Sequence, residues 1–331
     1  MLNPDLNLNP NLFDDDVEME PTRNGYGSGL ILAGEANENV VALTADLSES
    51  TRTDAFAKKF PKRFFEVGVA EQGMVTIASG LSAAGKIPFV ASYATFCPGR
   101  TLEQIRTTIC YNNANVKIAG HHAGLSVGPD GATHQALEDV AIMRALPNMR
   151  VIVPCDALEA ERATCAASTL WGPVYLRFSR EKTRVLTTKD TPFIPGKADA
   201  FYWTDRPRVL VLGTGPVLYS ALCAAKELEK QKIGVIVLNV HTIKPLDTTK
   251  IIELAGRIRA VVTVEEHQVA GGLGGVVAEL LSEKCPVPLE RVGVEDRFGE
   301  SGKPEELLRR HGIDTAGVIS AIKRVLKRKD R

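Results

Sequence analysis

The chain lacks several features that would place it in a common class of protein. Its 40 lysine and arginine residues balance 40 aspartate and glutamate residues, so no basic field is available to hold nucleic acid or an anionic membrane surface. No apolar run approaches the roughly 20 residues needed to cross a bilayer. The acidic, asparagine- and proline-rich start has neither the basic nor the apolar region of a signal peptide. The six cysteines never form a CxxC pair, which argues against a disulfide framework or zinc site and predicts a reducing cytoplasm.

Common nucleotide and hydrolase motifs are also absent. The sequence contains no G-x-x-x-x-G-K-[ST] loop, no G-x-S-x-G elbow and no H-E-x-x-H helix. Two glycine clusters, at 213–215 and 271–275, could suggest a dinucleotide site. In the first, Leu218 occupies the third glycine position of the fingerprint, and the second follows the polar run EEHQVA rather than a strand. We interpret both as tight turns with close helix packing.

The pattern that is present alternates short β-rich runs with longer helical ones. Such alternation predicts an α/β fold of two domains, each a mostly parallel sheet flanked by helices. We expect strands at 40–44, 87–92, 116–120, 151–153, 174–178, 209–212, 235–238 and 260–264, and helices at 71–84, 102–111, 158–169, 217–229, 248–255, 273–281 and 316–327. The expected organisation is a disordered acidic tail (1–20), a first domain (21–182), a linker (183–206) and a second domain (207–331).

Polar side chains cluster after several of the predicted strands of the first domain. Ligands of open α/β sheets bind outside the carboxyl ends of the strands, so clusters at corresponding ends indicate a site. They are the run 44–50, Glu71, the aromatic pair Tyr93 and Phe96, the loop 121–135, and Ser179 with Arg180.

At these positions the sequence closely resembles the C-terminal two-thirds of transketolase, the thiamine diphosphate enzyme that moves two-carbon ketol units. The resemblance is carried by FFEVGVAEQGMVTIASGLSAAG, SYATF, HHAGLSVGPDGATHQALED and EEHQVAGGLGGVVAELL, and it runs from about Thr22 to the end. It implies a pyrimidine-binding domain followed by a transketolase C-terminal domain. The second of these brings no catalytic match and is expected to serve packing and assembly.

One element of that family is missing. Thiamine diphosphate enzymes usually hold the diphosphate through Mg²⁺ on a Gly-Asp-Gly…Asn motif, and no GDG occurs here. The resemblance therefore implies one subunit of a split transketolase. An N-terminal partner subunit would supply the diphosphate and Mg²⁺ site, in an expected α₂β₂ assembly, and no metal site is predicted on this chain.

The resemblance assigns roles at the cofactor. Glu71 matches the catalytic glutamate, whose carboxyl group hydrogen-bonds to N1′ of the aminopyrimidine; by itself it would be a first-turn residue that complements the helix dipole. Phe96 and Tyr93 match the aromatic wall of the pyrimidine pocket, although the family often has phenylalanine where Tyr93 stands. Asp46 matches a residue near the cofactor, with a structural role equally open.

The resemblance also assigns roles at the substrate. His134 would bond the donor's C1 hydroxyl and carbonyl and help to carry protons, and Asp130 would hold the acceptor's C2 hydroxyl. His122 matches a phosphate-side position; a metal pair with His121 is disfavoured because adjacent strand residues face opposite ways. The sugar-phosphate clamp would be formed by Arg23, Ser50 and Arg180, for which solvation or helix capping is the structural alternative.

Three other readings remain open. The β subunit of a 2-oxoacid dehydrogenase has a similar domain pair and size, but it would not need the sugar-phosphate residues. A fragment of a 1-deoxyxylulose-5-phosphate synthase would share Asp130-Gly-x-Thr-His134, and a pyruvate donor assay separates the two activities. An orphan half could act only in assembly or regulation.

Overall fold

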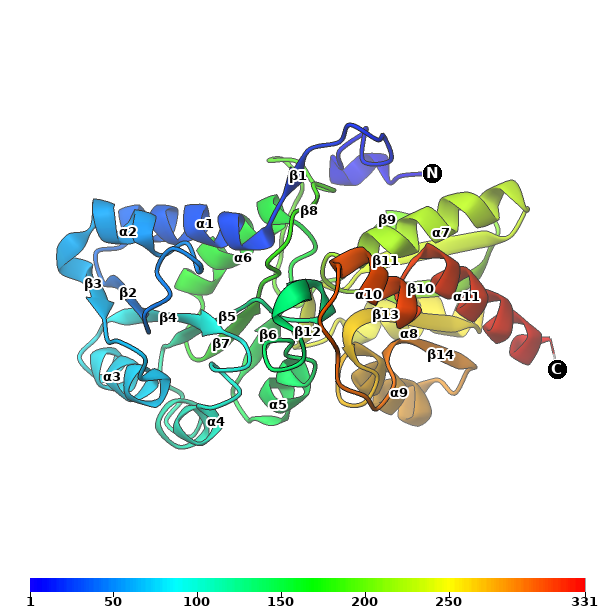
Figure 1. The fold of residues 1–331 in the computed structure, drawn as a ribbon. Coiled ribbons are helices and arrows are strands. Elements are labelled where there is room, and N and C mark those ends of the chain that lie inside the picture. The colour runs from blue at the N-terminus through cyan, green and yellow to red at the C-terminus, as the bar shows by residue number, and fades with distance from the viewer. Residues whose placement is uncertain (331) are drawn as a thin grey trace.

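The computed structural model describes residues 1–330 and shows two α/β domains side by side (Figure 1). The sheet of the first domain is parallel except at one edge. Its order is β12 (Thr242–Lys244), β6 (Arg150–Ile152), β7 (Val174–Arg177), β5 (Lys117–His121), β4 (Ile87–Tyr93), β2 (Val40–Thr44) and β3 (Phe64–Glu66). The register sets Thr44 opposite Ala91 and Tyr93 opposite His121, so the carboxyl ends of the central strands lie level. The expected fold class is confirmed.

Helices cover both faces of this sheet (Figure 1). One face carries α1 (Thr22–Ala36), α2 (Asp54–Lys59) and α6 (Ala157–Thr169), and the other carries α3 (Glu71–Ala83), α5 (Asp139–Ala145), and α4 (Leu102–Gln104) with its π-helical continuation (Ile105–Cys110). Helix α1 is rich in glycine, and its glycines allow it to pack very closely on α6. A Cβ at Gly25 would lie 1.8 Å from the Ala157 carbonyl oxygen, so a larger residue there would force the two helices apart.

The second domain repeats the plan on a smaller sheet. Its order is β14 (Leu289–Val294), β13 (Val261–Gln268), β10 (Pro207–Gly213), β11 (Gly234–Asn239) and β9 (Asp199–Tyr202), with β9 antiparallel. The flanking helices are α7 (Leu218–Lys230), α8 (Thr248–Ile258), α9 (Leu273–Lys284), α10 (Pro304–Arg310) and α11 (Thr315–Lys329). No helix within residues 1–330 is long and apolar enough to cross a membrane.

The prediction that residues 1–20 form a disordered tail is wrong. Leu6, Leu8 and Leu12 are buried in the hydrophobic cluster of the second domain. Backbone and side-chain amides of Asn3 donate to carbonyl oxygens of Phe201 and Ala200, and β1 (Met19–Glu20) pairs with β8 (Thr183–Arg184). Three leucines spaced along a polar segment supply the apolar surface that anchors the segment on the second domain. The sequence of the segment alone does not show that another domain covers these leucines.

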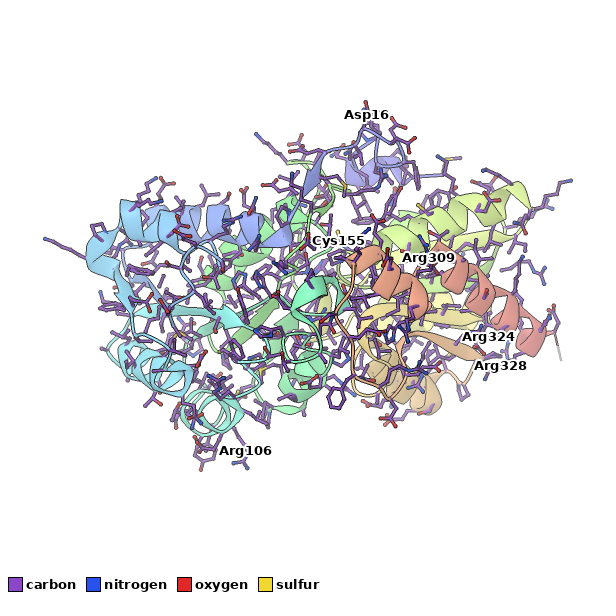
Figure 2. All side chains as sticks on the ribbon, viewed as in Figure 1. Asp16, Arg106, Cys155, Arg309, Arg324 and Arg328 are labelled. Carbon is purple, nitrogen blue, oxygen red and sulfur yellow. The ribbon has the colours of Figure 1, made fainter. Side chains whose placement is uncertain are left out.

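The expected linker also needs correction. Residues 183–206 contain β8 and β9, and β9 is an edge strand of the second sheet, so that domain begins before residue 207. The two domains also share a sheet, because β12, from the second half of the chain, pairs with β6 and extends the sheet of the first domain. Buried polar contacts join them, because Asn239 Nδ2 donates to Glu159 Oε1 at 2.7 Å. The buried Cys155 marks this boundary between the domains (Figure 2).

Candidate active site

Glu71 is the first residue of α3, and its side chain is only 2% exposed. Its Oε2 accepts a hydrogen bond from Arg100 Nη1 at 2.7 Å. The Arg100 side chain is itself about half exposed (48%), and its guanidinium lies over the ring of Phe96 at 4.7 Å. The site therefore holds a buried carboxylate whose cationic partner is half exposed to solvent.

Aromatic and imidazole rings gather beside this carboxylate. The rings of Tyr93 and Phe96 are stacked with centroids 5.8 Å apart, and His134 meets the edge of Phe96 at 5.6 Å. On its other side Tyr93 stacks on His122 at 4.0 Å. The ends of β4 and β5 thus bring together four residues that are up to 41 positions apart in sequence.

His122 is the centre of a cationic cluster. The residue is 2% exposed, and its Nε2 lies 3.1 Å from Arg23 Nη1. Burial, followed by the charges of Arg23 and Arg180, lowers the pKa of His122 to about 3, so the imidazole is neutral at physiological pH. Because a guanidinium only donates, Nε2 accepts and Nδ1 carries the proton. That buried Nδ1 has no hydrogen-bond partner among the described residues.

His121 faces away from this cluster, as the strand alternation predicts. It is fully buried against Tyr26 and Phe178, with ring centroids 4.8 and 5.1 Å away. The following residue, His122, has a φ of 51°, and this left-handed backbone turns it into the cluster.

The remaining expected residues surround the cluster with differing contacts. Arg180 Nη1 donates to the carbonyl oxygen of Val127 at 2.9 Å and lies 3.3 Å from Asp130 Oδ1. Ser50 contributes its carbonyl oxygen, which accepts from Arg23 at 3.1 Å, rather than its hydroxyl. Asp46 is exposed at the end of β2, where its backbone N–H donates to Glu66 Oε1 at 2.7 Å.

The loop that carries Asp130 and His134 is held by the second domain. The Glu266 carboxylate, 4% exposed at the end of β13, accepts from the backbone N–H of Ser126. Gly124 has a φ of 91°, and a Cβ there would lie 2.4 Å from the same carboxylate. Arg177 Nη2 donates to the carbonyl oxygens of Ala136 and Glu266, at 3.2 and 2.9 Å, and so joins the loop to the second domain.

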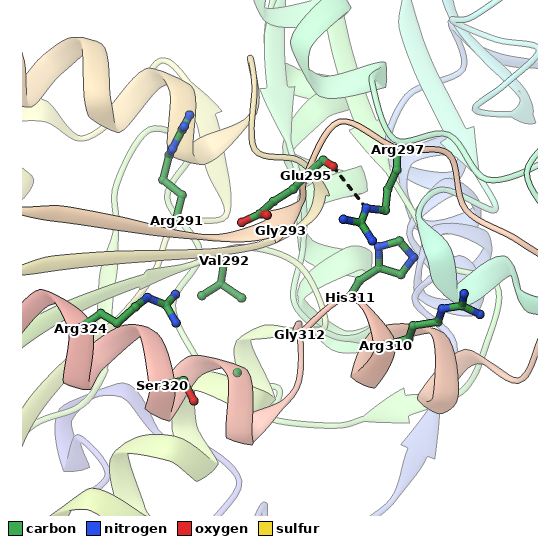
Figure 3. Close-up of a pocket in the computed structure, with 11 residues that line it drawn as sticks. Arg291, Val292, Gly293, Glu295, Arg297, Arg310, His311, Gly312, Ser320 and Arg324 are labelled. Carbon is green, nitrogen blue, oxygen red and sulfur yellow. Dashed lines mark hydrogen bonds between the residues drawn. The ribbon is translucent and has the colours of Figure 1, made fainter.

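A separate cavity of about 290 Å³ lies in the second domain, between the edge strand β14 and helices α10 and α11 (Figure 3). Four of its lining residues are arginines, but they do not converge. Arg291 points to one side of β14, and Arg310 projects away from the other members (Figure 3). Arg310 and Arg324 are paired with Glu300 and Glu290 at 2.7 and 2.9 Å. We therefore do not regard this cavity as an anion site.

Both domains of the chain match known family models. The first domain matches the model of the transketolase pyrimidine-binding domain over residues 19–185, and the second matches the model of the transketolase C-terminal domain over residues 198–318. The chain belongs to the transketolase family.

Individual relatives agree with this assignment. A "Putative transketolase C-terminal section" of Methanocaldococcus jannaschii is 42% identical, over 92% of this chain and 96% of that protein. The 6-deoxy-6-sulfo-D-fructose transketolase subunit SqwH of Clostridium sp. (strain MSTE9) is 38% identical, over 96% and 98%. A solved split-gene transketolase, described as an inactive β4 tetramer, is 44% identical with a TM-score of 0.87, over 93% of this chain and 99% of that one. By contrast, the chain spans about half the length of rat transketolase.

The site fits the pyrimidine end of thiamine diphosphate. Glu71 offers a buried carboxylate, Phe96 offers a ring face, and the His134 imidazole lies against the Phe96 ring. Within residues 1–330, no group of three or more histidine, cysteine, aspartate or glutamate side chains is arranged to hold a metal ion.

Sequence reasoning missed three residues of this neighbourhood. Arg100 lies in a turn after the aromatic pair, where nothing in its spacing points back to Glu71. Glu266 is distant in sequence and acts through a backbone contact. Arg52 follows Ser50 by two positions, and a basic residue in the same strand-end loop was a signal that could have been used.

Proposed function

We propose that this chain is the C-terminal subunit of a split transketolase. With an N-terminal partner that supplies the diphosphate and Mg²⁺ site, it would transfer a two-carbon ketol unit from a ketose phosphate to an aldose phosphate. Thiamine diphosphate, when bound, supplies the carbanion chemistry for breaking and forming the carbon–carbon bond. The residues of this chain orient the reactants, exclude water and move protons.

Each part of the cluster has a role in this proposal. Glu71 would hydrogen-bond to N1′ of the aminopyrimidine, whose ring would lie on Phe96. Because Arg100 contacts both of these residues, its side chain must leave when the ring binds. His134, whose imidazole lies against Phe96, would move a proton at the substrate's oxygen atoms, and Asp130 would hold a hydroxyl group of the acceptor.

The observation that carries the sugar-phosphate assignment is the set of cations around His122. Arg23 and Arg180 both depress its pKa, and Arg23 has a buried Nε with no partner among the described residues. Unpaired buried donors and concentrated positive charge favour an anion, and guanidinium forks match phosphate oxygens. A chain built only to decarboxylate a small 2-oxoacid would have no use for such a cluster.

The need for a partner is supported by chain length and by relatives. This chain has the extent of the Methanocaldococcus protein described as a C-terminal section, and the solved split-gene β4 tetramer is described as inactive. We infer an assembly of two copies of each subunit, located in the cytoplasm.

The test is reconstitution. This chain and a candidate N-terminal subunit with a GDG…Asn motif are co-purified and assayed with xylulose 5-phosphate and ribose 5-phosphate, in the presence of thiamine diphosphate and Mg²⁺. We expect activity from the complex and none from either chain alone. Full turnover by this chain alone would refute the split-enzyme proposal.

The alternatives are decided by the same complex. Pyruvate as donor, with glyceraldehyde 3-phosphate as acceptor, would reveal a deoxyxylulose phosphate synthase. Oxidative decarboxylation of a 2-oxoacid would reveal a dehydrogenase subunit. A complex that forms but is inactive with all of these substrates would indicate that the chain acts only in assembly or regulation.

A further inference from the structure

A third arginine, besides Arg23 and Arg180, lies beside the cationic cluster around His122. Arg52 lies in the loop between β2 and α2, two residues after Ser50, with a φ of 63°. Its Nε donates to Asn24 Oδ1 at 2.8 Å and its Nη1 to the Glu49 carbonyl oxygen at 3.2 Å. Asn24 is the residue after Arg23 in the first turn of α1, so Arg52 is fixed alongside Arg23.

The fold makes room for Arg52 at this place. A Cβ at Gly27 of α1 would lie 2.8 Å from the Arg52 Cβ, so glycine is needed there for the loop to approach the helix so closely. Left-handed backbone is unfavourable at a residue other than glycine and concentrates at functional sites. Two separate features of the chain therefore keep Arg52 in position.

Arg52 adds positive charge that no carboxylate neutralises. Among the described residues, neither Arg52 nor Arg23 forms an ion pair within 4.0 Å, whereas Arg180 is paired with Asp130. Burial is the main cause of the lowered pKa of Arg23. Among neighbouring charges, the guanidinium of Arg52 lowers that pKa most. Like charges held together in this way are unfavourable unless an anion lies between or beside them.

The terminal group of the substrate decides how much Arg52 matters. A phosphate monoester carries a charge close to −2 at neutral pH, whereas a sulfonate of nearly the same shape carries −1. Hydrogen-bond donors such as His122 and Arg180 can serve either group. A fixed charge that is not itself a contact acts through Coulomb energy, which is proportional to the charge of the ligand.

We propose, resting on the proposed function above, that Arg52 is a specificity-determining residue that favours substrates ending in a dianionic phosphate over those ending in a monoanionic sulfonate. It acts through space on the group held by Arg23, His122 and Arg180. The distinction is relevant because one relative of this chain is named for a sulfonated ketose.

The experiment compares three acceptors that differ in terminal charge. They are D-ribose, 5-deoxy-5-sulfo-D-ribose and D-ribose 5-phosphate, assayed with the reconstituted complex. For Arg52→Gln we expect kcat/KM to fall about threefold per unit of ligand charge. This means no change for D-ribose, a loss of about threefold for the sulfonate and a loss of about tenfold for the phosphate. The losses should fall mainly on KM and shrink at high salt. Arg52→Lys, which keeps the charge, should recover most of the phosphate activity.

Arg106→Gln serves as the matched control. Arg106 is an exposed arginine on the π-helical segment, away from the cluster (Figure 2), and its loss should affect the three acceptors equally or not at all. Equal losses for all three acceptors in Arg52→Gln, or equal damage by Arg52→Gln and Arg52→Lys, would make Arg52 a structural residue and refute the proposal.

A binding measurement separates this proposal from the proposed function. The His122 ring resonances of the isolated chain are titrated with inorganic phosphate and with methanesulfonate. We expect phosphate to bind more tightly, and Arg52→Gln to remove about threefold of that preference. An unchanged preference would overturn the role of Arg52. Absence of ketol transfer by the wild-type complex would instead overturn the proposed function.

Discussion

Replacing Asp139 with asparagine should destabilise the protein strongly. The Asp139 side chain is 1% exposed at the start of α5 and accepts hydrogen bonds from Arg177 Nε at 2.8 Å and from the Tyr175 hydroxyl at 2.6 Å. Arg177 also donates to Glu266 of the second domain. Asparagine fills the same volume but leaves a buried guanidinium without its counter-charge.

The size of the effect follows from that uncompensated charge. Removing one partner of a buried ion pair costs about 3–5 kcal/mol. Total stabilities of domains lie at about 5–15 kcal/mol, so a loss of about 3–5 kcal/mol in Asp139→Asn should remove roughly a fifth or more of the free energy of unfolding. Arg177→Met combined with Asp139→Asn removes both charges, and the double variant should be more stable than the sum of the single losses predicts.

The assay is urea unfolding of the purified chain at pH 7, followed by circular dichroism. The control is Asp54→Asn, which breaks the solvent-exposed pair with Lys58 at 2.9 Å and should leave the midpoint unchanged. A loss below about 1 kcal/mol for Asp139→Asn would refute the reasoning. So would strict additivity with Arg177→Met.

The pH dependence has a defined sign. Burial, the largest single influence, raises the pKa of Asp139. The charges of Arg177 and His267 and the hydrogen bonds from Arg177 and Tyr175 together outweigh burial, so the net pKa is lower than that of a free aspartate. The stabilisation is therefore complete above the unfolded pKa of about 3.9 and disappears as the pH falls through the lowered folded value. Wild type and Asp139→Asn should converge in stability in that acidic range.

Three other substitutions test the site. Glu71→Gln should leave the complex assembled but lower turnover by about a hundredfold or more, because an amide cannot supply the acid proton; an unchanged rate of H/D exchange at thiamine C2 would remove Glu71 from the mechanism. Arg180→Ala should raise KM for ribose 5-phosphate about ten- to a hundredfold with little effect on glycolaldehyde, and equal losses for both acceptors would make Arg180 structural. Arg100→Ala should free Glu71 and Phe96, so that the complex binds thiamine diphosphate about two- to fivefold more tightly in a fluorescence titration; weaker binding would show that Arg100 supports the cofactor instead.

Much of the site could be anticipated because its parts are local in sequence. The motif around Glu71 lies on one strand–turn–helix unit, and SYATF lies at the end of one strand. The rule that parallel strands present their carboxyl ends at one edge then predicts that Tyr93, Phe96 and His134 meet, and the structure brings their rings within 6.1 Å of one another. The roles of these residues in catalysis stay predictions.

The contacts that complete the site were not predictable in this way. Arg100 reaches Glu71 across 29 positions and Glu266 reaches Ser126 across 140. The charge state of His122 depends first on burial and then on nearby charges that include three arginines from separate segments. None of these pairs has a spacing or periodicity that marks it in a linear sequence.

The sequence by itself determined the alternation of strands and helices, the two α/β domains and the family to which the chain belongs. These properties depend on hydrophobic periodicity and on motifs within single elements, which are local. Only the tertiary structure decided that residues 1–20 pack on the second domain, that β12 joins the sheet of the first, and that the guanidiniums of Arg23, Arg52 and Arg180 surround one neutral imidazole. Those outcomes depend on burial and Coulomb energy between distant segments, and such energies are set only when the chain has brought the segments together.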